Sequence, residues 1–215
     1  MMRRLAIAMM VAGAVMVFGS APADAQRAPA PMDLLDALGT GQIEATFYGN
    51  GDQSVRGRVR RTAFGPEQLY VSPGTQFWAQ RDGLQGMTTL GWVPIDLART
   101  PIQYVEIPTA CTNFDLPAPT PMDRMNPVCC PEPRMAQLAE YVGRRHPEQP
   151  VAQIAVWAVA NNPEWSAIAG HVEARAKAET DEARTAQAEQ WRKQAAELMV
   201  VAGLNPANYR VFRAP

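Results

Sequence analysis

The feature that most constrains the fold is a change of hydrophobic pattern at Asn113. Before it, apolar and polar residues alternate in short runs, which is the period of a half-buried β-strand. Residues 114–133 then contain six prolines, and we expect no regular structure there. Beyond them, apolar residues recur at helical spacing. The chain therefore predicts an α+β protein, with an antiparallel sheet first and a helical segment second.

The N-terminal part predicts an antiparallel β-sandwich, either Ig-like or closed into a small barrel, over residues 40–113. A linker with one short helix precedes it over residues 26–39. Glycine, proline and aspartate separate short runs that have strand-like alternation. We expect strands at 42–48, 54–62, 67–72, 75–80, 86–97 and 102–111.

The first two strands also predict their own register. Apolar residues share one face of each strand, so a slip by one residue would invert every side chain. A five-residue turn over residues 49–53 keeps these faces together. It places Phe47 opposite Val55 and Glu44 opposite Arg58. The charged pair would add a favourable cross-strand contact of up to about 1 kcal/mol.

Residues 134–215 predict a helical segment, which the crossover of residues 114–133 joins to the sheet. The first helix has one apolar stripe, and the second is apolar nearly all round and should be buried. The last is largely polar, with Thr180 as its cap. We expect helices at 134–145, at 150–162, from Pro163 and at 180–199, and a closing strand at 209–212.

Residues 1–25 predict export. Arg3 and Arg4 precede an apolar run, and an A-x-A cleavage pattern ends at Ala25, as in secretory signal peptides. The apolar run is short for a membrane span. Cleavage would leave residues 26–215 in the periplasm or secreted to the medium, with no later segment long and apolar enough to span a membrane.

The charge of the chain is balanced, with 20 lysines and arginines against 21 aspartates and glutamates. Such a chain has no global attraction to nucleic acid, and we expect a protein or an envelope component as its partner. Arg56, Arg58 and Arg60 nevertheless alternate along one expected strand and share its outer face. This stripe is either an ordinary solvated face or a contact surface for a polyanion or partner protein of the envelope.

Cys111, Cys129 and Cys130 are the main candidates for chemistry. Export would place them in an oxidising compartment, where disulfides persist. A bridge from Cys111 to either of the other two would close a loop of about twenty residues and stabilise the fold by about 3 kcal/mol. Because a bridge between adjacent cysteines is strained, we expect one such disulfide and one spare thiol. The sequence does not choose between Cys129 and Cys130 as the partner.

A metal site is the first alternative. Met122 and Met125 precede Cys129 and Cys130, and thioether and thiolate ligands together select Cu(I). Methionines are also ordinary packing residues, and a disulfide would consume a ligand. We therefore expect no resident cofactor and keep copper or thiol-redox handling as the second function.

An enzyme is the remaining alternative. A catalytic cysteine would need a base, and His146 and His171 are the candidates, although both suit surface or helix-end positions. The chain has no nucleotide-binding, lipase or zinc-protease motif. A hydrolase with a dispersed site stays open because such a site leaves no local pattern. The preferred interpretation is a non-enzymatic protein.

Five short stretches of the chain form a recognisable set: GQIEATFYGNG (41–51), VSPGTQF (71–77), QGM (85–87), CTN (111–113) and QIAVWAV (153–159). Together they resemble a pattern of secreted bacterial proteins. The resemblance implies a small Ig-like β-sandwich followed by helices in an exported protein, and it implies no activity. It agrees with the preferred function, an interaction or structural protein of the envelope.

Overall fold

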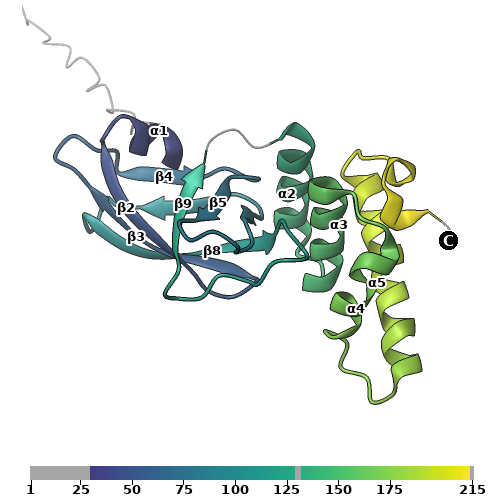
Figure 1. Ribbon diagram of the computed structural model, residues 1–215. Helices are drawn as coiled ribbons and strands as arrows, with labels where there is room; N and C mark the ends of the chain where they lie inside the picture. The colour runs from purple at the N-terminus through teal and green to yellow at the C-terminus, as the bar shows by residue number, and fades with distance from the viewer. Residues whose placement is uncertain (1–29, 129–131, 214–215) are drawn as a thin grey trace, which may run out of the picture.

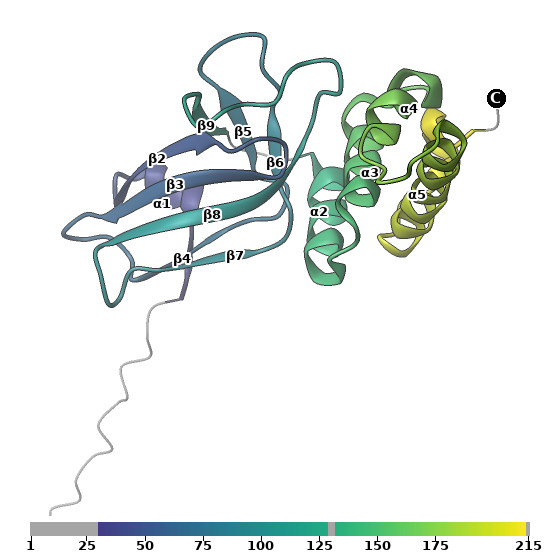
Figure 2. The same cartoon turned by 90° about the horizontal axis from the view of Figure 1, so that it is seen from below.

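The computed structural model describes residues 30–128 and 132–213. A β-rich unit comes first and a helical unit second, so the α+β prediction is confirmed. Figure 1 shows the two units side by side, with the helices packed beyond one end of the β-rich unit. The view turned by 90° in Figure 2 shows helices α2 and α3 nearest to the strands and α5 on the far side.

Six antiparallel strands of the first unit close into a barrel in the order β2-β3-β8-β6-β5-β9. The Ig-like sandwich is therefore not confirmed, and the strands form the small barrel that the sequence left open beside it. The barrel consists of β2 (Ile43–Gly49), β3 (Ser54–Arg61), β5 (Gln76–Ala79), β6 (Met87–Thr89), β8 (Ile102–Cys111) and β9 (Arg124–Val128).

A second sheet of three strands completes the β-rich unit, in the order β1-β4-β7. Helix α1 follows β1 directly, and Asp33 caps it by accepting a hydrogen bond from the Leu35 N–H (2.7 Å). The short helix expected within residues 26–39 is thus confirmed. These elements are β1 (Met32–Asp33), α1 (Leu34–Gly39), β4 (Gln68–Val71) and β7 (Val93–Asp96).

Strand alternation fills the barrel with apolar side chains. Phe47 and Phe77 meet inside it with 5.1 Å between ring centroids, in the edge-to-face arrangement that aromatic rings favour. Val55, Val59 and Ile107 are fully buried in the same core. The inward faces of the first two barrel strands are therefore as predicted.

The register of these two strands differs from the prediction by two residues. Phe47 pairs with Gly57 rather than Val55, and Glu44 pairs with Arg60 rather than Arg58. The reason is steric, because a Cβ atom on Gly57 would lie 2.3 Å from the Phe47 ring. The buried ring needs a residue without a side chain opposite it.

The single strand expected over residues 86–97 is two strands in the structure, β6 and β7. Gly91 separates them in the left-handed region, with φ of +85°. β6 belongs to the barrel and β7 to the three-stranded sheet. The apolar residues on both sides of Gly91 fit one continuous strand pattern, so the prediction of a single strand was wrong.

Part of the proline-rich segment is also regular, contrary to the prediction, because β9 closes the barrel between β2 and β5. β2 pairs with β9 only at Arg124 and Met125. Pro127 therefore lies where β9 has β5 alone as a partner. A proline, which has no N–H to donate, is tolerated at such a half-free position.

All four predicted helices are present. Thr180 caps the last one, as expected, by accepting a hydrogen bond from the Ala183 N–H (3.2 Å). None of the helices in the described part of the chain is both long and apolar enough to cross a membrane. The helices are α2 (Pro133–Arg145), α3 (Gln149–Asn161), α4 (Trp165–Glu173) and α5 (Asp181–Val201).

The closing strand expected at 209–212 is wrong. Two short 3₁₀ turns, η1 (Pro206–Asn208) and η2 (Arg210–Phe212), occupy this region. The Arg192 guanidinium donates to the carbonyl oxygen of Val211 (2.7 Å) and so ties the tail to α5. The apolar residues of the tail are buried against helices and need no strand partner.

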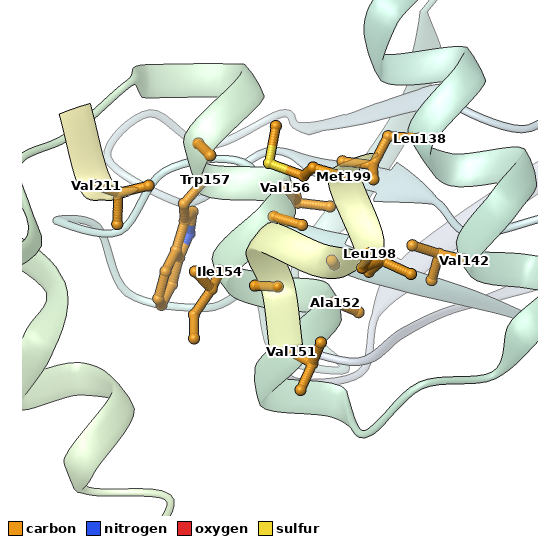
Figure 3. Close-up of a cluster of buried hydrophobic side chains, with 14 of the residues drawn as sticks. Leu138, Val142, Val151, Ala152, Ile154, Val156, Trp157, Leu198, Met199 and Val211 are labelled. Atoms are coloured by element: carbon orange, nitrogen blue, oxygen red, sulfur yellow. The ribbon is translucent and has the colours of Figure 1, made fainter. Parts of the chain in front are cut away.

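The second core lies among the helices (Figure 3). α3 is its centre, and the Trp157, Val156 and Ile154 side chains are buried there. Met199 of α5 closes the same cluster. The prediction that 150–162 is a buried helix is thus confirmed, since α3 packs between α5 and the end of β8.

Gln153 fastens this helix to the barrel. Its side-chain oxygen accepts from the Cys111 N–H (3.0 Å), and its side-chain nitrogen donates to the Cys111 carbonyl oxygen (2.7 Å). The carboxamide therefore satisfies both backbone groups of the last β8 residue, as a neighbouring strand would. A second close contact joins Gly143 of α2 to Gly91, where a Cβ on Gly143 would lie 2.2 Å from the Gly91 Cα.

Candidate functional site

Cys111 lies inside the barrel and is buried. Its sulfur is 3.6 Å from the Met87 sulfur and 3.8 Å from the Asp52 carbonyl oxygen. Burial, reinforced by the negative charge of Asp52, raises the pKa of the Cys111 thiol to about 12. A cysteine nucleophile must be a thiolate, so this buried thiol is poorly suited to act as a nucleophile at neutral pH.

Cys129 and Cys130 lie outside the described residues, so the predicted disulfide and the spare thiol stay predictions. Cys111 forms no disulfide within residues 30–128 and 132–213. It ends β8, whereas β9 ends at Val128 on the opposite side of the barrel, with two strands between β8 and β9 in either direction. A disulfide needs Cα atoms within about 7 Å of each other, so the predicted bridge requires the chain after Val128 to return toward the end of β8.

The two predicted methionine ligands occupy different environments. Met125 is only 1% exposed inside the barrel, whereas Met122 is 88% exposed in the turn before β9. The copper hypothesis also needs Cys129 and Cys130, so it stays a prediction. In the described ranges, no group of three or more His, Cys, Asp or Glu side chains is placed to hold a metal ion.

The two histidines occupy positions at or near helix ends. His146 ends α2 in the left-handed conformation, with φ of +48°, and its N–H donates to the Val142 carbonyl oxygen (2.9 Å). His171 is exposed in the last turn of α4, with its ring 6.3 Å from the Trp157 ring. The neighbours of the Cys111 sulfur are Met87 and the Asp52 backbone. Neither His146 nor His171 is hydrogen-bonded to Cys111 as a catalytic base would be.

Arg56, Arg58 and Arg60 all project from the outer face of β3, as alternation predicted. Arg60 forms an ion pair with Glu44 (2.6 Å), and Arg56 forms one with Glu106 (3.5 Å). The hydrogen bond and positive charge of Arg60 lower the pKa of Glu44. The two outer arginines of the stripe are therefore matched by carboxylates.

Arg58, in the middle of the stripe, has no carboxylate partner in the part of the chain that the structure describes. Thr46 of β2 and Tyr104 of β8 lie directly opposite it on the two neighbouring strands. Tyr104 is 78% exposed. The centre of the stripe thus presents an unpaired guanidinium beside an exposed phenol.

The neighbouring strands extend this surface. Arg124 of β9 pairs across from Tyr48 of β2, which in turn pairs across from Arg56. Four arginines therefore face two carboxylates, and the surface is positive although the chain is not. We call it the arginine face and define it by Arg56, Arg58, Arg60, Arg124, Tyr48 and Tyr104.

Two cavities lie where the barrel meets the helices, and Arg175 lines both. Its guanidinium is 2.5 Å from the Asp52 carboxylate of the barrel and donates to the Gln149 side-chain oxygen of α3 (2.8 Å). The larger cavity, of about 860 Å³, we call the seam groove. Its lining is Gln53, Glu148, Gln149, Pro150, Arg175, Lys177, Ala178, Gln187, Gln190 and Trp191.

The smaller cavity, of about 630 Å³, bears on the hydrolase alternative. Asp52, Asp115 and His171 all line it, and none of the side-chain hydrogen bonds among the described residues joins Asp115 to His171. A hydrolase that uses a serine or cysteine nucleophile requires that nucleophile, a base and an orienting group in hydrogen-bonded sequence. The lining of this cavity presents no such series.

Sequence reasoning found the arginine stripe but missed its neighbours. Tyr104 and Arg124 join it only through strand pairing, and the register that places them was not available from alternation alone. The seam groove draws residues from three distant parts of the chain and left no local signal. Comparisons with protein-family models, with curated proteins and with solved structures found no match to this chain.

Proposed function

We propose that this chain is an exported, non-enzymatic interaction protein that binds an anionic polymer of the cell envelope through the arginine face. The observation that carries the proposal is Arg58, a cation without a carboxylate partner among the described residues, beside the exposed ring of Tyr104. Export is part of the proposal and is supported by the signal-peptide pattern of residues 1–25.

The arrangement favours an extended anion over a small one. A guanidinium presents a planar fork that suits carboxylate and phosphate groups. Arg56 and Arg60 lie four residues apart on β3, which is about 13 Å at about 3.3 Å per residue. Arg124 adds a further cation two strands away. Repeated negative charges along a polymer would match cations spaced in this way.

The decisive experiment measures binding of residues 26–215 to immobilised polygalacturonate, a polymer of carboxylates, by biolayer interferometry at low and high salt. We expect saturable binding that weakens as salt rises, because the contacts are exposed. Arg58→Ala should weaken it about tenfold, since one charge-assisted hydrogen bond contributes about 1.5 kcal/mol or more.

Arg99→Ala is the matched control, because Arg99 is exposed and lies outside the arginine face. It should bind as tightly as the wild-type chain. Equal losses from Arg58→Ala and Arg99→Ala would mean that total charge, not this surface, governs binding. Absence of binding at low salt would count against the proposal as a whole.

A further inference from the structure

The seam groove is rich in carboxamides, and most of its charged groups already have partners. Gln53 reaches it from the β2–β3 loop, Gln149 from the start of α3, and Gln187 and Gln190 from α5. A side-chain carboxamide offers two N–H donors and one carbonyl acceptor on a planar group. Four of them in one groove provide donors and acceptors from several directions.

The ionic groups of the groove are largely occupied. Arg175 is paired with Asp52 (2.5 Å), and the Glu148 carboxylate accepts from the Trp191 indole N–H (2.9 Å). Lys177 is exposed at the rim. The groove therefore favours a ligand that hydrogen-bonds without a strong net charge.

Gln149 carries an unused donor at this place. Its side-chain oxygen accepts from Arg175 (2.8 Å), which fixes the orientation of the carboxamide. Its side-chain nitrogen is buried and has no acceptor among the described residues. This nitrogen is buried beneath the groove surface, so the ligand contacts come from Gln53, Gln187 and Gln190, which are partly or fully exposed.

An apolar wall accompanies these polar groups. Trp191 borders the groove but is only 6% exposed, because its indole packs in the helical core and donates a hydrogen bond to Glu148. Pro150 and Ala178 lie on the same lining. Apolar walls with a few fixed polar groups are typical of sites for small organic ligands.

We propose that the seam groove binds a saccharide. Each sugar hydroxyl both donates and accepts, as the carboxamides do, and the C–H face of a sugar ring can pack against the partly exposed Pro150 and Ala178 of the lining. A volume of about 860 Å³ accommodates more than one sugar ring. The groove shares no residue with the arginine face, so this proposal goes beyond the proposed function and each can fail alone.

The test is isothermal titration calorimetry of residues 26–215 with two neutral probes, chitotetraose and maltotetraose. We expect saturable binding of at least one probe, because both offer runs of hydroxyl groups. The double variant Gln187→Ala/Gln190→Ala should weaken that binding about tenfold, since each lost hydrogen bond contributes about 1 kcal/mol. Both residues are partly or fully exposed, so the thermal midpoint should not fall.

Gln194→Ala is the matched control, because Gln194 is on the same helix but does not line the groove. It should leave saccharide binding unchanged, and so should Arg58→Ala. The proposal is overturned if neither tetrasaccharide binds, or if Gln194→Ala weakens binding as much as the double variant does. Loss of polygalacturonate binding alone would instead reject the proposed function of the arginine face.

Discussion

At the scale of single residues, burial sets the reactivity of Cys111. Its sulfur packs on Met87, and its pKa is raised to about 12. We expect iodoacetamide to leave Cys111 unlabelled in the native protein and to label it once urea exposes the thiol. Peptide mass spectrometry measures both states. Labelling that requires urea together with a reductant would show instead that Cys111 is in the bridge that the sequence predicts.

The same thiol makes stability depend on pH. The unfolded cysteine titrates near about pH 8.5, so the unfolded chain loses this proton before the folded chain does. The contribution of the neutral thiol is present below that pH and is lost as the pH rises toward the folded pKa of about 12. In urea unfolding above about pH 9, wild-type stability should fall by up to about 1.4 kcal/mol per pH unit more than that of Cys111→Ala. Parallel pH curves for the two proteins would contradict this.

Gln153 is the residue on which docking of α3 depends most. Gln153→Leu would leave the Cys111 N–H and carbonyl oxygen buried without their partners. We expect a loss of at least about 2 kcal/mol in the free energy of unfolding, because each orphaned group costs about 1–3 kcal/mol. Urea denaturation measures it. Gln137→Leu, at an exposed position of α2, should change stability by less than about 0.5 kcal/mol.

At the scale of elements, α2 approaches the barrel through two glycines. A Cβ on Gly143 would lie 2.2 Å from the Gly91 Cα, whereas a Cβ on Gly170 of α4 meets nothing within 4 Å. Gly143→Ala should therefore destabilise the protein by about 1–3 kcal/mol. Gly170→Ala should stabilise it by up to about 1 kcal/mol, since alanine favours a helix over glycine. Equal urea midpoints for the two variants would show that α2 does not dock this closely.

Alternation predicted the strands well but not their register. Faces repeat every second residue, so a shift by two residues leaves every inward side chain inward. The choice between the two registers came from one contact, the Phe47 ring over Gly57, which only the folded barrel contains. The same shift moved Glu44 from Arg58 to Arg60 and left Arg58 unpaired. The unpaired cation at the centre of the arginine face was therefore beyond the sequence pattern.

The predictions for two further segments, the strand β9 and residues 209–212, were wrong because they relied on the local preferences of single residues. The prolines near Pro127 predicted irregular structure. A proline is nevertheless compatible with β-pairing where the strand has a partner on one side only, as β9 has at Pro127. Apolar residues argued for a strand at 209–212, but Val211 is buried by helices without any ladder. Helices, by contrast, were predictable because capping and apolar stripes are local signals. The seam groove was not, because its residues meet only after the units dock.

At the scale of the whole molecule, the barrel and the helices have separate hydrophobic cores that meet at β8. Cys111 belongs to the barrel core, whereas Ala110, the residue before it, belongs to the helical core. Adjacent residues of a strand point to opposite faces, so one strand can serve both cores. Among the described residues, the contacts that join the two units include the end of β8 with the Gln153 carboxamide, the Gly91–Gly143 contact and the Asp52–Arg175 ion pair, and the two apolar cores stay separate.

Because the two cores are separate, a substitution that destabilises one core should affect that unit more than the other. Trp157→Ala should destabilise the helical core by about 3–5 kcal/mol, because it removes a large buried side chain. In native-state hydrogen exchange, amides of α3 and α5 should then lose protection before those of β3 and β8. Trp92→Ala, at a residue that is 55% exposed, should leave both groups protected. An equal loss across helices and barrel would mean that the seam couples the two cores into one cooperative unit, and the contacts at β8 would then be stronger than their geometry suggests.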